Sequence, residues 1–334
     1  MKRRLLLAAA AVAVFGTVRA QDVHYTQANL LPTLTNPAQT GNYEGTFRLG
    51  GLYRSQWSQG IKNGYSTPLA FADFNINGFR KTDWIGLGVN FYQDKAGIAA
   101  LTQSLAGITG AYHIGLNRKM TSVVSLGVSV GFGQRRVDET KLRFEGGLLT
   151  GNNADYPNIT NDALNYTDIG AGIDYYTKIG KADRFNIGLN VAHLVAPKFN
   201  LVTPTAFKLS SLLIFHTEYE RALGKRLSVT PSLLLRKANA GSFTGNLMAM
   251  GAYKLDIKRN IALRAGAGYR FGDALMLLLG VDYGSFRVGG AFDLTTSAVR
   301  NDTNIQDGFE VGLTYIGKIY KKPNVKPVII CPRF

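Results

Sequence analysis

The 334-residue sequence contains a single cysteine, Cys331, which excludes an internal disulfide bond. After the first twenty residues it also lacks any run of about 18 apolar residues, so no membrane-spanning helix is predicted. Only 18% of the residues are charged, whereas glycine, phenylalanine and tyrosine number 38, 18 and 16. This composition suits an all-β chain held together by backbone pairing, either a soluble domain or an outer-membrane barrel.

Residues 1–20 have the properties of a secretory signal peptide. A basic start at Lys2 to Arg4 is followed by an apolar stretch at 5–16, which is too short to span a bilayer. Ala20 supplies a small residue directly before the expected cleavage site at Gln21. We therefore expect an exported protein whose leader takes no part in the fold.

Alternation of apolar with small or polar residues is the main pattern after residue 45. In 84–91, for example, Ile85, Leu87 and Val89 alternate with glycines and Asn90, as expected for a strand with two different faces. About fourteen segments follow this pattern, and most reach the roughly 9–11 residues that a tilted strand needs to cross a bilayer. They are 45–57, 65–77, 83–94, 101–114, 120–136, 162–178, 183–195, 210–220, 225–236, 242–255, 259–271, 274–283, 284–295 and 308–320. The prediction is a transmembrane antiparallel β-barrel of about 14 strands.

The connections between these segments support a barrel. Every second connection is short, and nearly all of these short turns are basic. The other set includes the long stretches 137–161, 196–209 and 296–307. Outer-membrane barrels combine short periplasmic turns with longer outer loops, whereas a soluble sandwich has no reason to separate its loops in this way. The basic charge that gives a formal net charge of +16 therefore gathers partly at one rim, with more on the inward strand faces, and we expect no nucleic-acid partner.

If the apolar strand face meets lipid, the face with glycines and charges lines the interior. Seven charged side chains are predicted to point inward near the seam between the first and last strands. They are Arg48, Arg54, Arg264, Arg270, Arg287, Asp293 and Glu310. Two interpretations are open: a lattice of ion pairs that satisfies buried charges, or a site for a ligand or plug.

No catalytic or cofactor motif is present. The four histidines, His24, His113, His193 and His216, have no metal-ligand spacing and no cysteine partner. His193 and His216 lie on neighbouring predicted strands, so contact between them is possible. Neither a Gly-x-Ser-x-Gly elbow nor a phosphate-binding loop occurs. We expect no enzyme, no metal and no cofactor.

Short motifs stand at both ends of the chain. The amino-terminal stretch QDVHYTQANLLPTLTNPAQTG is followed by YRSQW at 53–57, and the chain ends in CPRF. These motifs resemble the PorP/SprF family of type IX secretion and gliding-motility proteins of Bacteroidetes. The matching positions include His24, Gln27, Asn36, Pro37, Gly41, Trp57, Cys331, Pro332, Arg333 and Phe334. Their roles are expected to be structural or to involve partner contacts.

The resemblance implies a non-enzymatic outer-membrane barrel that supports secretion or surface attachment of a protein with a C-terminal sorting domain, together with periplasmic components of the apparatus. A barrel that transports solutes, similar to fatty-acid channels, is the alternative. We divide the chain into a signal peptide (1–20), a lead-in or plug segment at the periplasmic mouth (21–44), a barrel in outer-membrane lipid (45–320) and a tail (321–334). Both termini are expected on the periplasmic side.

Overall fold

The computed structural model describes residues 23–56, 64–77, 80, 82–97, 101–138, 163–195, 198–202, 205–239, 241–297 and 308–319. The predicted signal peptide at 1–20 and the tail at 321–334 lie outside these ranges. So do five motif residues, Trp57, Cys331, Pro332, Arg333 and Phe334.

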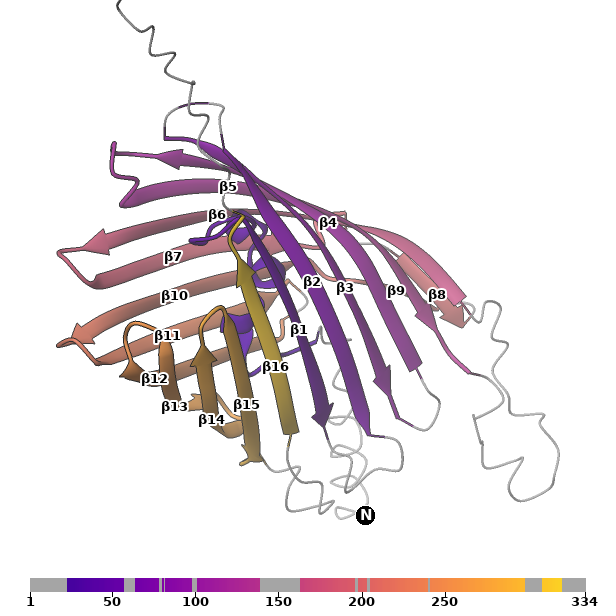
Figure 1. Ribbon diagram of the computed structural model, residues 1–334. Helices are drawn as coiled ribbons and strands as arrows, with labels where there is room; N and C mark the ends of the chain where they lie inside the picture. The colour runs from indigo at the N-terminus through magenta and orange to yellow at the C-terminus, as the bar shows by residue number, and fades with distance from the viewer. Residues whose placement is uncertain are drawn as a thin grey trace, which may run out of the picture.

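Fourteen antiparallel strands close into a barrel, as predicted (Figure 1). They are β1 (Phe47–Gln56), β2 (Tyr65–Asn77), β3 (Trp84–Ala96), β4 (Leu101–Gly115), β5 (Ser122–Arg136), β6 (Ala163–Ile179), β7 (Asp183–Ala192), β10 (Leu212–Leu223), β11 (Leu227–Ala238), β12 (Phe243–Asp256), β13 (Ile261–Arg270), β14 (Ala274–Tyr283), β15 (Phe286–Thr295) and β16 (Gly308–Gly317). Each strand pairs with its neighbour in sequence, and β1 pairs with β16 along its whole length to close the sheet. Closure leaves no strand edge unpaired, as a lipid environment requires.

A small additional sheet was not predicted. The connection between β7 and β10 contains a separate two-stranded sheet, formed by β8 (Lys198–Val202) and β9 (Thr205–Lys208). We had treated 196–209 as a loop, because strands of five and four residues are too short to show a clear alternation.

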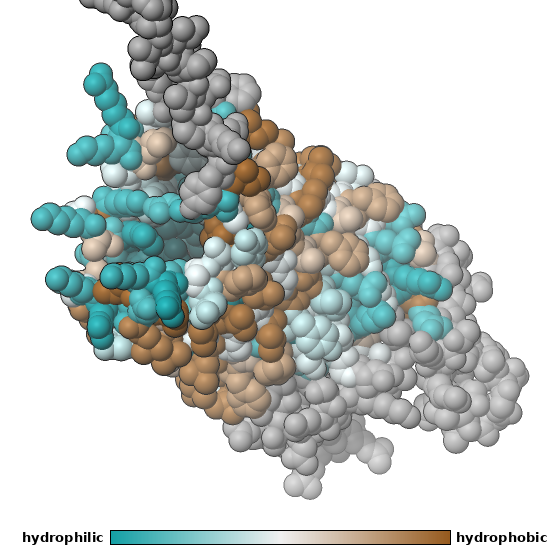
Figure 2. Space-filling model, viewed as in Figure 1, coloured by the Kyte–Doolittle hydropathy of each residue, from teal (hydrophilic) through white to brown (hydrophobic). Residues whose placement is uncertain are grey.

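The outer face of the barrel is apolar. Val89, Ile108, Val128 and Leu279 expose 53%, 62%, 58% and 70% of their surface, and many other large apolar side chains lie on the same face. On the face seen in Figure 2, hydrophobic residues, coloured brown, cover much of the strand surface. Within the described residues, no helix is both long and apolar enough to cross a membrane. The exposed band is the surface that lipid covers in a transmembrane barrel.

The two ends of the barrel differ. At one end, here called the short-turn end, the strands are joined by the connections 78–83, 116–121, 180–182, 224–226, 257–260 and 284–285. The opposite end, here called the long-loop end, carries the remaining connections, among them 137–162 and 296–307. This division follows the alternation of loop lengths seen in the sequence.

The chain before β1 lies inside the barrel (Figure 1). We call residues 23–46 the interior segment; it contains the 3-10 turns η1 (Ala28–Leu30) and η2 (Pro37–Gln39) and one helical turn, α2 (Pro32–Thr35). Asn36 is extended, with φ −153° and ψ 118°, and its side chain accepts a hydrogen bond from the N–H of Ala38. Pro37 favours this extended conformation at the preceding residue and starts η2 with its fixed φ.

The path of the interior segment corrects one expectation. It begins beside Arg236, near the long-loop end of β11, and reaches the short-turn end where Thr46 bonds Gly317. The sequence predicts a lead-in or plug segment at the periplasmic mouth, but the described part of this segment is not confined to one mouth and runs the length of the interior. The first and last described residues, Val23 and Ile319, therefore lie at opposite ends of the barrel. Small inward-facing residues of the strands make this path possible, as shown below.

Candidate functional site

The interior segment is held first in the half of the barrel next to the long-loop end. The carboxylate of Glu310 accepts hydrogen bonds from the backbone N–H groups of Thr26 at 2.6 Å and Gln27 at 2.9 Å. The hydroxyl of Thr26 donates to Asp293 at 2.7 Å. Thr26 itself is fully buried. Two carboxylates of the barrel wall therefore fix the start of the segment.

Two arginines balance these two carboxylates. Arg54 pairs with Glu310 and, at 3.0 Å, with Asp293. Arg270 lies 3.1 Å from Asp293 and donates to the Thr26 hydroxyl at 2.7 Å. All four charged side chains are almost completely buried. A buried charge is costly unless it is paired and hydrogen-bonded, and this cluster of two positive and two negative groups meets both conditions.

A second attachment lies near the middle of the segment and depends on Asn36. Its Nδ2 donates to the carbonyl oxygen of Ile173 at 2.9 Å and lies 3.2 Å from Nε2 of His216. Next to it, the Gln39 side chain donates to Asp174 and Asn186, each at 3.1 Å. The wall residues come from β6, β7 and β10. In the order of strands around the barrel, these three are far from the β1–β16 seam.

A third attachment lies towards the short-turn end. The carbonyl oxygen of Thr40 is 2.7 Å from Nε2 of His113, and its hydroxyl donates to Thr109 at 2.9 Å. Asp73 accepts the N–H of Gly41 at 2.7 Å and is paired with Arg48 at 2.6 Å. Polar wall residues thus bind the segment as it leaves the barrel.

Tyr43 completes this third attachment. Its hydroxyl donates to the carbonyl oxygen of Asp73 at 2.7 Å, and its ring lies 4.5 Å from the guanidinium carbon of Arg48. Burial, assisted by the negative charge of Asp73, raises the pKa of Tyr43 well above its ordinary value. The phenol therefore remains a neutral hydrogen-bond donor over the physiological pH range.

Glycines on the inner face make room for the segment. A Cβ at Gly127 would overlap the backbone of Pro37 and Ala38, and one at Gly86 would overlap the backbone of Thr40. At Gly172 a Cβ would overlap the side chain of Asn36. Any larger residue at these positions would displace the segment, so close backbone approach explains why glycine occurs within these strands.

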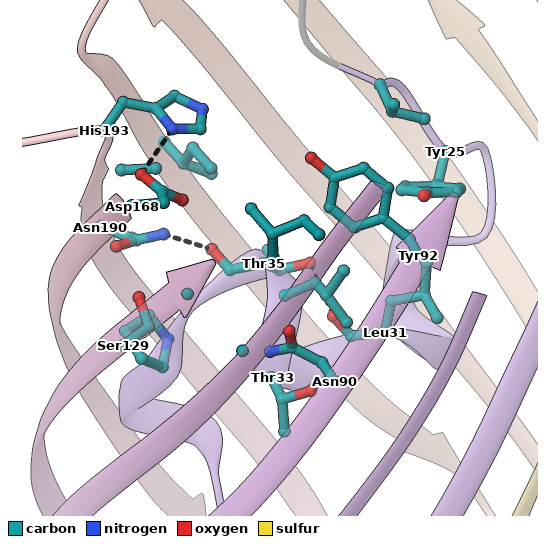
Figure 3. Close-up of a pocket in the computed structure, with 18 of the residues that line it drawn as sticks. Tyr25, Leu31, Thr33, Thr35, Asn90, Tyr92, Ser129, Asp168, Asn190 and His193 are labelled. Atoms are coloured by element: carbon teal, nitrogen blue, oxygen red, sulfur yellow. Dashed lines mark hydrogen bonds and ion pairs between the residues drawn. The ribbon is translucent and has the colours of Figure 1, made fainter. Parts of the chain in front are cut away.

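A cavity of about 120 Å³ remains between the segment and the wall (Figure 3). Apolar groups of both parts line it, including Leu31 and Leu34 of the interior segment and Leu105 and Ile214 of the strands. Polar side chains also reach it, among them Asn90, Asn190 and Thr33. Asp168 and His193 are hydrogen-bonded at its edge, with Oδ1 and Nδ1 2.8 Å apart.

The interior next to the short-turn end is polar. Asp282 pairs with Arg264 and Arg287, each at 2.8 Å, and Arg287 exposes 41% of its side chain. Around this end, the exposed charged side chains in the described parts of the short turns are all basic: Arg80, Arg118, Lys119, Lys181, Lys225, Arg226, Lys258 and Arg259. Figure 2 shows hydrophilic side chains projecting around a hollow mouth at the left of the molecule.

The structure divides the seven predicted inward charges into three groups. Arg54, Arg270, Asp293 and Glu310 form the first attachment, Arg48 belongs to the third, and Arg264 and Arg287 meet at the short-turn mouth. The acidic partners Asp73 and Asp282 were missed. Both lie on the inner face in step with the alternation of β2 and β14, a signal that could have identified them.

The motif residues of the amino-terminal stretch all belong to the interior segment. His24 accepts from Arg236 at 2.8 Å, while Gln27, Asn36, Pro37 and Gly41 are buried. His193 and His216 do not pair with each other, because each has a partner of its own. In the part of the chain that the structure describes, no group of three or more histidine, cysteine or acidic side chains is arranged to hold a metal.

Two solved structures with a similar fold are a transporter and a channel. The toluene transporter TodX of Pseudomonas putida superposes with a TM-score of 0.50 at 10% identity, covering 90% of this chain and 96% of that one. The monoaromatic hydrocarbon channel CymD has a TM-score of 0.50 at 11% identity, covering 87% and 93%. At such identities the likeness concerns the fold alone. The fold defines an outer-membrane β-barrel with an amino-terminal segment inside it.

The sequence profile of the type IX secretion system membrane proteins PorP/SprF matches residues 17–315. The chain belongs to this family, as its motifs had indicated. Family and fold are those of secretion and transport barrels. No curated protein matches the sequence.

Proposed function

We propose that this protein is an occluded outer-membrane barrel that supports type IX secretion, or surface attachment of a secreted protein, by binding partners rather than by conducting solutes. The observation that carries this proposal is the interior segment, which is attached to the wall at three levels. A barrel whose lumen is filled by its own buried chain is suited to present loops and rims to other proteins. Catalysis is not part of the proposal.

The basic short-turn end is the proposed contact for periplasmic components of the apparatus. Short turns of outer-membrane barrels are periplasmic, so a ring of exposed lysines and arginines would face the periplasm. Such a ring favours a partner with an acidic surface, because complementary charges speed encounter and fix orientation. The long-loop end is then the proposed contact for the secreted protein with its C-terminal sorting domain.

Charge reversal tests the periplasmic contact. Lys225→Glu with Arg226→Glu reverses two exposed charges in one short turn, and we expect loss of co-purifying periplasmic components from native membranes. Arg136→Glu with Lys237→Glu makes the same change at the long-loop end and serves as the control. Equal recovery of partners from both double variants would contradict the proposed contact.

Solute transport is the second candidate, and the internal cavity favours it. A disulfide between Thr40→Cys and Thr109→Cys, in a Cys331→Ser background, separates the two functions. The hydroxyl oxygens of these residues are 2.9 Å apart, close enough for a disulfide after small adjustments.

With this disulfide formed, the segment is held to β4. A docking barrel should still support secretion, whereas a channel that opens by moving the segment should lose solute uptake. Either single cysteine variant controls for the substitutions themselves. Secretion that fails only when the cross-link forms would overturn the docking proposal.

A further inference from the structure

The cavity beside α2 contains polar atoms without partners. Oδ1 of Asn90, Oδ1 of Asn190 and Oγ1 of Thr33 are buried, and no residue that the structure describes hydrogen-bonds to them. Asn190 and Thr33 are each 3% exposed. Buried polar groups are almost always paired in folded proteins, so three such atoms around one cavity indicate an occupant.

The amide nitrogen of Asn190 fixes the orientation of this side chain. Its Nδ2 donates to the carbonyl oxygen of Thr35 at 3.1 Å, which leaves Oδ1 as the free acceptor of a side chain that lines the cavity (Figure 3). Two charged side chains also line the cavity, and each already has a partner: Asp168 bonds His193, and Arg236 bonds the carbonyl oxygen of Val23. Both charged side chains that line the cavity are therefore already engaged in hydrogen bonds, which leaves the amide and hydroxyl groups to bind an occupant.

Most of the remaining lining is apolar. Leu31, Leu34, Leu105 and Ile214 line the cavity. Tyr25 and Tyr92 line it as well, and Figure 3 shows their side chains near Leu31. A cavity of about 120 Å³ is similar to the roughly 150 Å³ apolar cavity that accepts benzene in an engineered protein. Water alone would satisfy the polar atoms but not this apolar lining.

We propose that this cavity is a binding site for a small neutral molecule with an apolar, ring-sized body and one or two hydroxyl donors. The hydroxyls would donate to Asn90 and Asn190, and the ring would lie against the leucines. The site does not depend on the secretion role proposed above, so failure of either proposal leaves the other intact.

Phenol and benzene are suitable probes, used with the full mature chain in lipid nanodiscs and with empty nanodiscs as the blank. We expect saturable phenol binding by calorimetry. Asn90→Leu removes an unpartnered acceptor at nearly constant volume, so phenol should bind about tenfold more weakly while benzene binding is retained. Equal loss of both ligands, or no saturable phenol binding by the native protein, would overturn the proposal.

A second variant tests the location. Ser129→Leu fills the cavity from β5, and we expect it to abolish phenol binding. Val128→Leu adds a methylene one residue earlier but on the outer face, where Val128 is 58% exposed, and should leave binding unchanged. A difference in electrophoretic mobility between heated and unheated samples verifies that both variants are folded barrels. Unaltered phenol binding in folded Ser129→Leu would place the ligand elsewhere and refute the proposed site.

Discussion

Arg54 and Glu310 are cross-strand partners on β1 and β16, the two strands that close the barrel, and Glu310 also binds the backbone of Thr26 and Gln27. One carboxylate therefore links barrel closure to the position of the interior segment. Because all these groups are buried, neither the seam nor the segment can be altered alone without leaving a charge or a backbone N–H unpaired.

Glu310→Gln should destabilise the protein strongly. It leaves the arginines Arg54 and Arg270 with Asp293 as their only fully buried carboxylate, and breaking a buried pair costs about 3–5 kcal/mol. Urea unfolding in lipid vesicles measures the change. The double variant Arg54→Met with Glu310→Gln removes one charge of each sign, so it should be more stable than Glu310→Gln; a lower stability would contradict this charge balance.

Gly127→Ala should displace the interior segment without breaking the barrel. The new Cβ would overlap the backbone of Pro37 and Ala38, and such overpacking costs about 1–3 kcal/mol. Faster cleavage of the segment by an added protease reports the displacement. In Gly110→Ala the nearest atom is 3.7 Å from the new Cβ, so this variant should be cleaved as slowly as the native protein.

Asn36→Asp should lower stability by about 1–3 kcal/mol, because the carbonyl oxygen of Ile173 loses its donor while the acceptor for Ala38 is kept. Thermal unfolding followed by electrophoretic mobility provides the measurement. Asn165→Asp is the matched control, since exposed Asn165 only accepts from Gln134 and keeps that ability. If Asn36→Asp left the stability unchanged, the attachment near the middle of the segment would contribute little to it.

The ion pair at the exit of the segment predicts a small pH effect. The hydrogen bond and charge of Lys178, 2.8 Å away, lower the pKa of Glu44. The pair therefore stabilises the protein above the ordinary glutamate pKa of about 4.3, and this contribution disappears as the pH falls through the lowered pKa.

Glu44→Gln should accordingly reduce stability at pH 7 by less than about 1 kcal/mol, since the Glu44 side chain is 72% exposed. The difference in unfolding temperature between the native protein and the variant, measured from neutral to acidic pH, checks this effect. A difference that grows on acidification would show that the sign is wrong.

Much of the barrel could be predicted from residues alone. Alternation along segments such as 84–91 is a local property, and the period of two places every second side chain on the same face. It identified all fourteen barrel strands, including β2, β4, β10 and β12, whose alternation is weak. The short β8–β9 sheet was not predicted, because its strands are only five and four residues long.

Less of the candidate site could be predicted from the sequence. Motif residues such as Asn36 and Pro37 indicated the family and a local turn, but not the wall residues Ile173 and His216 that Asn36 contacts. These partners lie more than a hundred residues away in the sequence. No periodicity encodes such contacts.

The sequence by itself determined the alternating strands, the unequal loops and the family motifs, because each depends on residues close together in the chain. Only the tertiary structure decided that residues 23–46 run through the barrel and leave a partly polar cavity beside α2. Closing the barrel brings glycines, carboxylates and arginines from distant strands around one path. The fit of the interior segment to that path depends on the combined shape and charge of these residues. No single strand supplies all of them.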